Sequence, residues 1–89
     1  MTRADIFNEL NIIFRNNFDD ESITLTDATS SADIEDWDSL EQINLVVAIQ
    51  NKFGIKFNIE EVNAMKNVGE MVDFIITKLN FETRTNNLR

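Results

Sequence analysis

A serine follows an acidic residue at the start of the strongest amphipathic pattern in the chain, in the run Trp37-Asp38-Ser39-Leu40-Glu41. Asp38 is suited to cap a helix, and Glu41, three residues on, can reach back to complete a capping box. Ser39 would then be the first helical residue, with a solvent-facing hydroxyl in the positive field of a helix N-terminus, where a phosphate group is stabilised. Because the string Asp-Ser-Leu also occurs by chance, these residues alone do not distinguish a modified serine from an ordinary helix start.

The composition excludes most catalytic chemistry. The 89 residues suffice for one domain, and 16 acidic against 8 basic side chains give a formal net charge of -8. That balance disfavours nucleic acid and anionic membranes as partners and favours a basic protein surface. There is no Cys and no His, so thiolate nucleophiles, disulfides and the usual general base are absent. We therefore expect neither intrinsic enzyme activity nor a metal site.

The start of the chain, Met1-Thr2-Arg3-Ala4-Asp5, mixes polar and apolar residues and is not typical of a signal peptide. No stretch is long and apolar enough to insert into a bilayer. We expect a cytoplasmic, reduced setting.

A first helix is predicted from Thr2 or Arg3 to Asn16 or Asn17. Its apolar stripe consists of Ile6, Phe7, Leu10, Ile13 and Phe14, with Phe18 as a further candidate. The connection over residues 19–37 is long and rich in Asp, Ser and Thr, which favours turns. Its apolar residues are spaced like anchors that dock the loop on the bundle: Ile23, Leu25, Ile34 and Trp37. The oxygen-bearing residues from Asp27 resemble a calcium loop only superficially, because Ala32 replaces the required Gly and Asp38 replaces the final Glu.

A second helix is predicted from Ser39 to Phe53, with Gly54 as its left-handed C-cap residue. Its main apolar face is expected to comprise Leu40, Ile43, Val46, Val47 and Phe53. Leu45, Ala48 and Ile49 broaden that face. A helix this apolar is expected to be covered on more than one side.

Two further capping-box patterns follow, Asn58-Ile59-Glu60-Glu61 and Asn67-Val68-Gly69-Glu70. They predict a short helix to Met65 and a last helix to Asn80, with Gly69 allowing close packing. The predicted fold is all-α, a four-helix bundle of three long helices and one short one with a long loop between the first two. Residues 1–80 form the domain, residues 81–89 a frayed tail, and the chain is expected to be a monomer.

The stretch from Ile34 to Leu79 resembles the acyl carrier proteins and their carrier-domain relatives in fatty acid, polyketide and nonribosomal peptide synthesis. The resemblance covers Asp38-Ser39-Leu40, the helix after it, and Phe53-Gly54 at that helix's end. It also includes the short capped helix from Asn58, and Asn67-Val68 at the start of the last helix. An ordered layout of landmarks is more specific than three residues.

The resemblance implies that a phosphopantetheinyl transferase uses coenzyme A to attach 4'-phosphopantetheine to Ser39, flanked by Asp38 and Leu40 as the recognised motif. The thiol of that group would carry acyl intermediates as thioesters, and the protein would be a non-catalytic carrier. It further implies enzyme partners with basic docking patches that read the face of the second helix. The candidate partner-binding residues are Asp36, Trp37, Glu41, Asn44, Val47, Glu60 and Glu61.

A pocket for the acyl chain is also implied by the resemblance, with ordinary core packing as the alternative. Its candidate lining residues are Val46, Phe57, Val62, Met65 and Val68. Two departures from typical fatty-acid-synthase carriers, Trp37 before the motif and Gln50-Asn51-Lys52 late in the helix, indicate a specialised carrier. An aminoacyl or peptidyl carrier loaded by an adenylating enzyme, and an acidic helical adaptor without a prosthetic group, remain alternatives.

Overall fold

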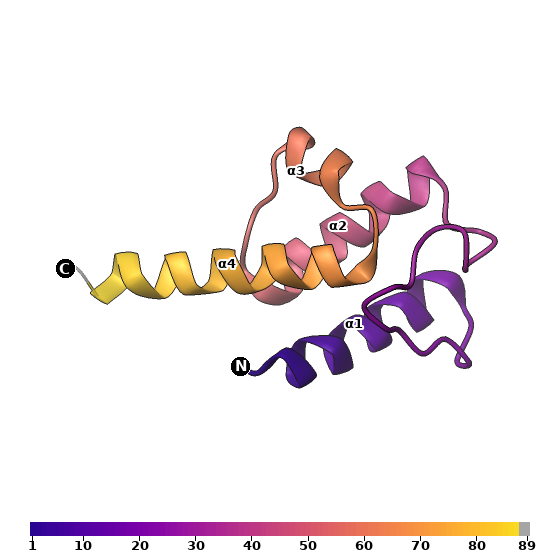
Figure 1. Cartoon of the computed structure of the whole chain (residues 1–89), viewed down its shortest axis with the longest axis horizontal. Coiled ribbons are helices and arrows are strands. Elements are labelled where there is room, and N and C mark those ends of the chain that lie inside the picture. The colour runs from indigo at the N-terminus through magenta and orange to yellow at the C-terminus, as the bar shows by residue number, and fades with distance from the viewer. Residues whose placement is uncertain (88–89) are drawn as a thin grey trace.

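The computed structural model describes the backbone of residues 1–87 and the side chains of residues 1–80. This part of the chain contains four helices and no strand, which confirms the all-α prediction. The helices are α1 (Arg3–Phe18), α2 (Ser39–Phe53), α3 (Ile59–Ala64) and α4 (Val68–Asn87). Figure 1 shows α4 between α1 on one side and the short α3 on the other, with the loop from α1 to α2 wrapping one end of the bundle.

Local capping residues set where the helices begin and end. Asn58 and Glu61 form a complete capping box at the start of α3, as predicted. Thr2 and Asp5 form another at the start of α1, which was not predicted from the sequence. Asn67 Oδ1 accepts the Glu70 backbone N–H at 2.8 Å, whereas the Glu70 carboxylate does not close the predicted third box. The observed bounds of α2, Ser39 and Phe53, agree with the prediction. The capping residues at its two ends, Asp38 and Gly54, can be recognised from the sequence alone.

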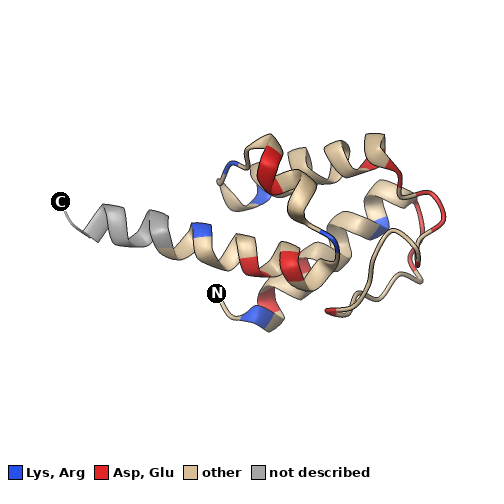
Figure 2. Ribbon diagram, turned by 45° about the horizontal axis from the view of Figure 1, so that its top comes forward, with Lys and Arg blue, Asp and Glu red and all other residues tan. Residues whose placement is uncertain are grey.

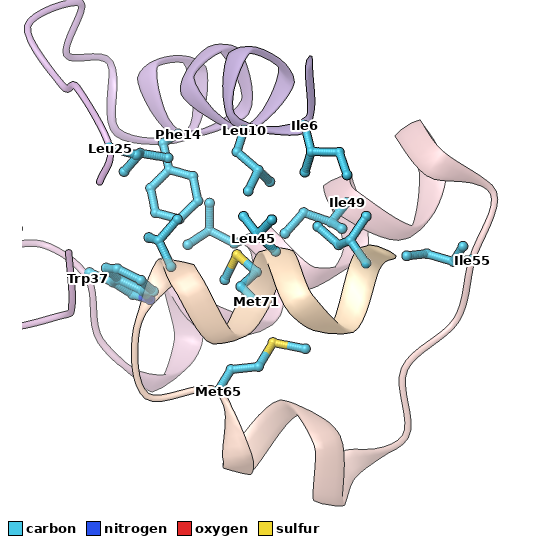
Figure 3. Close-up of a cluster of buried hydrophobic side chains, with 13 residues drawn as sticks. Ile6, Leu10, Phe14, Leu25, Trp37, Leu45, Ile49, Ile55, Met65 and Met71 are labelled. Atoms are coloured by element: carbon cyan, nitrogen blue, oxygen red, sulfur yellow. The ribbon is translucent and has the colours of Figure 1, made fainter. Parts of the chain in front are cut away.

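The core joins α1, α2 and α4 (Figure 3). Its fully buried side chains are Ile6, Leu10, Phe14, Leu45, Ile49, Val68, Met71, Val72 and Ile75. Within α3 itself no residue is buried, and Met65 directly after it is the residue that joins the core. α3 is therefore held mainly by the chain on either side of it rather than by its own apolar face.

The buried face of α2 differs from the predicted main face. Leu40, Ile43 and Val47 are 65%, 53% and 47% exposed. Val46 of the predicted face is buried, as are Leu45 and Ile49, and Phe53 is partly buried against the core. α2 is apolar around most of its circumference, so helical periodicity does not determine which stripe packs against α1 and α4.

The loop between α1 and α2 is held against the bundle by side chains and hydrogen bonds. Leu25 and Trp37 are buried, and Ile23 and Ile34 are partly buried against the core, which confirms the predicted anchors. Arg15 Nε donates to the Ile23 carbonyl at 2.7 Å, and the Leu25 N–H donates to Asn11 Oδ1 at 2.8 Å. The backbone polar groups of this loop thus find partners on α1.

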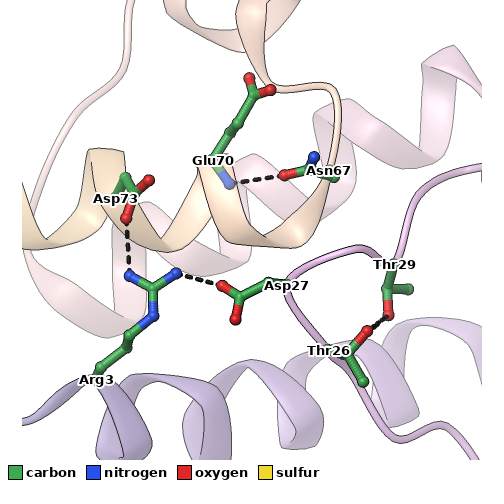
Figure 4. Close-up of polar contacts among 7 residues, drawn as sticks. All are labelled: Arg3, Thr26, Asp27, Thr29, Asn67, Glu70 and Asp73. Carbon is green, nitrogen blue, oxygen red and sulfur yellow. Dashed lines mark hydrogen bonds and ion pairs between the residues drawn. The ribbon is translucent and has the colours of Figure 1, made fainter.

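The same loop satisfies the start of α4. The backbone N–H groups of Val68 and Gly69 donate to the carbonyls of Thr29 and Asp27 at 2.8 and 2.9 Å. Figure 4 shows the Arg3 guanidinium paired with both Asp27 and Asp73, which links α1, the loop and α4. The first backbone N–H groups of a helix have no acceptor within the helix, so the two loop carbonyls supply the acceptors that α4 lacks.

The C-terminal helix is longer than predicted. α4 continues to Asn87, so the prediction that the helix ends at Asn80 is wrong. The domain bounds of 1–80 and the fraying of residues 81–89 stay predictions. The part of that tail at residues 88–89 lies outside the described residues. No helix in the described part of the chain, α4 included, is long and apolar enough to cross a membrane.

Replacing Gly69 with Ala is expected to lower the free energy of unfolding by about 1 kcal/mol, although Ala is the better helix former. A Cβ at this position would meet the Asp27 carbonyl oxygen at 2.9 Å, so the loop must move. Urea unfolding measures the change. An increase in stability, as helix propensity alone predicts, would contradict the close packing.

Gly54→Ala is the matched comparison. A Cβ there meets nothing within 4 Å, so only its left-handed backbone (φ of 67°) opposes the substitution. A loss of about 1 kcal/mol is expected for this reason alone.

Candidate functional site

Ser39 is the first residue of α2, and its side chain is exposed. Asp38 precedes it as the N-cap, with Oδ1 accepting the Glu41 backbone N–H at 2.9 Å. As the first two helical residues, Ser39 and Leu40 have backbone N–H groups without an acceptor inside the helix. An anion joined to the Ser39 hydroxyl would therefore lie in a favourable field, as predicted.

Trp37 fixes the position of this helix start. Its side chain is 8% exposed, and its ring packs edge-on against Phe14 of α1 with 5.1 Å between ring centroids. The indole Nε1–H donates to Gln42 Oε1 of α2 at 2.7 Å. One buried residue thus ties the loop to two helices immediately before Asp38 and Ser39. The core covers the Trp37 ring in this structure, and a contact of Trp37 with a partner stays a prediction.

A hollow of about 380 Å³ adjoins Ser39 between the start of α2 and the end of α3. We call it the Ser39 hollow. It is lined by Ser31, Trp37, Asp38, Ser39, Gln42, Ile43, Val62, Asn63, Met65 and Lys66. Its walls are mostly polar, and Lys66 is the cationic residue of its lining. A chain attached to Ser39 can therefore lie against the protein rather than extend only into solvent.

Gln42 carries a buried donor without a partner. Its Oε1 accepts from Trp37, but its Nε2 has no hydrogen-bond partner among the described residues and is shielded from solvent. The Trp37 N–H can only donate, so it fixes the amide with Oε1 toward the indole and Nε2 away from it. Leaving such a donor unpaired costs about 1–3 kcal/mol.

These residues fit a phosphopantetheine group. Such a group offers phosphodiester and amide oxygens, which are hydrogen-bond acceptors. The Ser39 hollow is lined by an exposed hydroxyl for attachment, by Gln42 with its unpaired but shielded amide donor, and by Lys66, beside the capping carboxylate of Asp38.

Three exposed apolar residues of α2 form a stripe that begins beside Ser39. The stripe comprises Leu40, Ile43 and Val47. Their spacing of three and four residues puts them on one face of the helix. Val47 was expected at a partner-binding face, whereas Ile43 was assigned only to the core. Whether Ile43 is buried or exposed depends on how α2 is rotated about its axis, and the sequence pattern alone does not determine that rotation.

The acidic residues predicted to bind partners differ in exposure and in the contacts that they make within the protein. Asp36 and Glu60 are exposed. Figure 2 shows acidic residues concentrated in the loop that leads into α2, and also on α3 and the first half of α4. Glu41 does not close the predicted capping box. Its Oε1 accepts from Asn17 Nδ2 and from Asn44 Nδ2, both at 3.1 Å, so its carboxylate joins α2 to the end of α1.

Glu61 is similarly engaged within the protein. Its carboxylate accepts the Asn58 backbone N–H at 2.9 Å and pairs with Lys78 Nζ of α4 at 3.0 Å. The Asn58 hydrogen bond and then the Lys78 contact lower the pKa of the Glu61 carboxyl below its ordinary value. This pair connects α3 to α4 and gives Glu61 a structural role beside any contact with a partner.

The five residues expected around an acyl chain do not share one open cavity. Val62 and Met65 line the Ser39 hollow. Val46 and Val68 are buried, and Val68 belongs to the core cluster. Phe57 packs edge-on against Phe74 of α4 with 6.4 Å between ring centroids.

A larger hollow, about 760 Å³, lies between the segment after α2 and the outer face of α4. Its lining includes Gly54, Lys56 and Thr77 but neither Ser39 nor any of the five predicted residues. Size alone therefore does not identify the site, because the larger hollow lacks the group to which a chain could be attached.

Comparison with known proteins gives a consistent result. Residues 17–75 match the family model described as the phosphopantetheine attachment site. The chain is 32% identical over 84 residues to the acyl carrier protein of Petrotoga mobilis, covering 92% of this chain and 96% of that protein. It is 44% identical over 46 residues to that of Acidothermus cellulolyticus, covering 52% of this chain and 55% of that protein.

A solved structure agrees over most of the fold. The solution NMR structure of the holo acyl carrier protein from Geobacter metallireducens matches with a TM-score of 0.82 at 42% sequence identity. The match covers 88% of this chain and 90% of that one.

The contacts of Glu61 predict a pH dependence of stability. A carboxyl whose pKa is lowered by folding contributes stability above its unfolded pKa and loses it as the pH falls through the folded value. Wild-type protein should therefore exceed Glu61→Gln in the free energy of unfolding at pH 7, and the difference should shrink between about pH 5 and pH 3. Urea unfolding across this range measures it. A difference that does not change with pH would contradict the charged contact.

Proposed function

This chain belongs to the acyl carrier protein family, and on that basis we propose that Ser39 is the residue to which its 4'-phosphopantetheine is attached. Proteins of this family are carriers without catalytic activity of their own, and the prosthetic group comes from coenzyme A. The observation that carries the assignment is the exposed Ser39 hydroxyl at the first position of α2, capped by Asp38 and adjoining a hollow with an unpaired donor.

The prosthetic group provides the thiol that the amino-acid sequence lacks. When attached, it supplies a terminal thiol that holds acyl groups as thioesters, and the chain itself has no Cys. The protein's own part is presentation: Trp37 holds the helix start in place, Asp38 completes it, and the free N–H groups of Ser39 and Leu40 favour the negative phosphodiester.

The exposed stripe of Leu40, Ile43 and Val47 is the proposed docking surface for the transferase and for the enzymes that load and process the acyl group. A small apolar centre with a polar, largely acidic rim suits a weak, reversible complex. The rim residues are Asp36, Asn44 and Glu60, with Glu41 and Glu61 partly committed to contacts inside the protein. A basic patch on each partner would be attracted to this rim, which speeds encounter more than it strengthens binding.

The cargo is proposed at the level of class: acyl intermediates in fatty acid, polyketide or related lipid synthesis. Trp37 and the run Gln50-Asn51-Lys52 support a specialised carrier. An aminoacyl or peptidyl cargo loaded by an adenylating enzyme is the alternative with the same serine chemistry. Of the predicted pocket residues, Val62 and Met65 are the candidates for contact with an acyl chain, because they line the Ser39 hollow. The cytoplasmic location stays a prediction.

Attachment at Ser39 is tested by intact mass after incubation with coenzyme A and a broad-specificity phosphopantetheinyl transferase. Wild-type protein should gain one phosphopantetheine, and Ser39→Ala should gain none while its helical circular dichroism stays the same. Ser31→Ala is the matched control, since Ser31 is also exposed and lines the same hollow. Modification that persists in Ser39→Ala, or that is lost in Ser31→Ala, would contradict the assignment. No modification of wild-type protein would favour the unmodified adaptor.

The docking surface is tested by a pair of isoleucines of nearly equal exposure. Ile43 on α2 is 53% exposed and Ile12 on α1 is 51% exposed. We expect Ile43→Ala to lower kcat/KM for the transferase about tenfold, because the few residues that cost more than about 1 kcal/mol on truncation cluster at the centre of an interface. Ile12→Ala should leave the rate unchanged, and both variants should unfold at similar urea concentrations. Equal rates for the two variants would exclude the stripe as the docking surface.

A further inference from the structure

Gln42 has no role in the attachment chemistry described above, yet it is the residue of the Ser39 hollow with an unmet hydrogen-bonding requirement. Its Oε1 is occupied by the Trp37 indole at 2.7 Å, and its Nε2 has no partner among the described residues. Buried polar groups are nearly always paired, so an unpaired one calls for a specific explanation. A ligand that brings an acceptor into the hollow would supply the missing partner.

The position of Gln42 limits which ligand that can be. It follows Ser39 by three residues on α2, and residues at this spacing are neighbours on a helix surface. It also lines the same hollow as Ser39. Anything attached to the serine hydroxyl and lying in the hollow therefore passes the Gln42 side chain.

We propose that Gln42 Nε2 donates a hydrogen bond to the phosphopantetheine arm on Ser39 and thereby holds the arm in the Ser39 hollow when no partner enzyme is bound. The inference depends on the attachment at Ser39 proposed above. Because Nε2 is shielded from solvent, the Gln42 amide must rotate to meet an acceptor in the hollow, and its terminal torsion is broad enough for Oε1 to keep the Trp37 hydrogen bond. Gln42 acts as a positioning residue and takes no part in thioester chemistry.

Trp37 is the second member of this arrangement. Because its indole can only donate, it leaves the Gln42 amide with the donor free rather than the acceptor. The oxygens of a phosphodiester and of the arm's amides all accept. Across the hollow, the cation of Lys66 complements the negative phosphodiester. The lining therefore combines the Gln42 donor and the Lys66 cation, which suit acceptors and negative charge, with the Asp38 carboxylate, whose Oδ1 is occupied by the Glu41 N–H.

The lack of Cys makes this testable without any partner enzyme. In the holo protein the only thiol is that of the arm, so its reaction with an aromatic disulfide reagent reports how often the arm leaves the hollow. Gln42→Glu keeps an acceptor for Trp37 but removes the donor. We expect its holo form to react about threefold to tenfold faster than wild type, the factor that one hydrogen bond contributes.

Gln50→Glu is the matched control. It makes the same chemical change on the same helix, and Gln50 Oε1 likewise accepts one hydrogen bond, from the Phe57 N–H at 2.9 Å. Gln50 does not line the Ser39 hollow. Its holo form should react at the wild-type rate.

A second readout uses only the wild-type protein and does not depend on whether the variants fold. In NMR spectra, the side-chain amide signals of Gln42 should move between the apo and holo forms, and their exchange with water should slow in the holo form. The signals of Gln50 should stay in place. Movement instead at Phe74 and Thr77 would put the arm in the larger hollow and overturn the proposal.

The two proposals fail differently. If the mass of wild-type protein rises by one phosphopantetheine at Ser39, but the Gln42 amide signals are unchanged and Gln42→Glu reacts at the wild-type rate, the arm is not held by Gln42 and the attachment site still stands. If no mass is added at Ser39, the attachment assignment fails, and the role of Gln42 fails with it.

Discussion

The burial of Trp37 is the constraint on which the site depends. A long loop must end at a defined point for the next helix to start with its first hydroxyl facing solvent. Trp37 provides that point by packing against Phe14 of α1 and donating to Gln42 of α2. A smaller residue here would leave the loop without its largest anchor, and Asp38 and Ser39 would lose their fixed relation to α1. The same indole also determines how the Gln42 amide is oriented, so one side chain links the fold to the lining of the Ser39 hollow.

The parts of the structure that the sequence predicted are those determined by a few adjacent residues. Asp38 and Gly54 define both ends of α2, Asn58 and Glu61 define the start of α3, and the resemblance to acyl carrier proteins is confirmed over most of the chain. Caps and turns depend on hydrogen bonds within three or four residues, so they can be read without knowing the tertiary fold. The exposed position of Ser39 at the first turn of α2 follows from the same local rule.

Several expectations about α2 and the residue before it depended on contacts between elements distant in sequence. Ile43 was assigned to the core because α2 is apolar nearly all round, and only packing against α1 and α4 selects Leu45 and Ile49 as the inward residues. Glu41 was expected to bond its own helix start, but Asn17 of α1 provides an alternative partner that no local pattern reveals. Trp37 was predicted both as an anchor of the loop and as a partner-binding residue, and the structure buries its ring against Phe14.

Ile43 belongs to two features at once, since it lies on the exposed stripe and also lines the Ser39 hollow. A partner that covers the stripe must contact the rim of the hollow in which the arm would rest. If both proposals hold, docking and release of the arm would be coupled physically, because contact with Ile43 would compete with the arm's contacts in the hollow. Binding energy gained at the stripe would be offset in part by loss of the Gln42 hydrogen bond. Such an offset favours a complex that forms quickly and dissociates after each step, which is what a carrier visiting several enzymes requires.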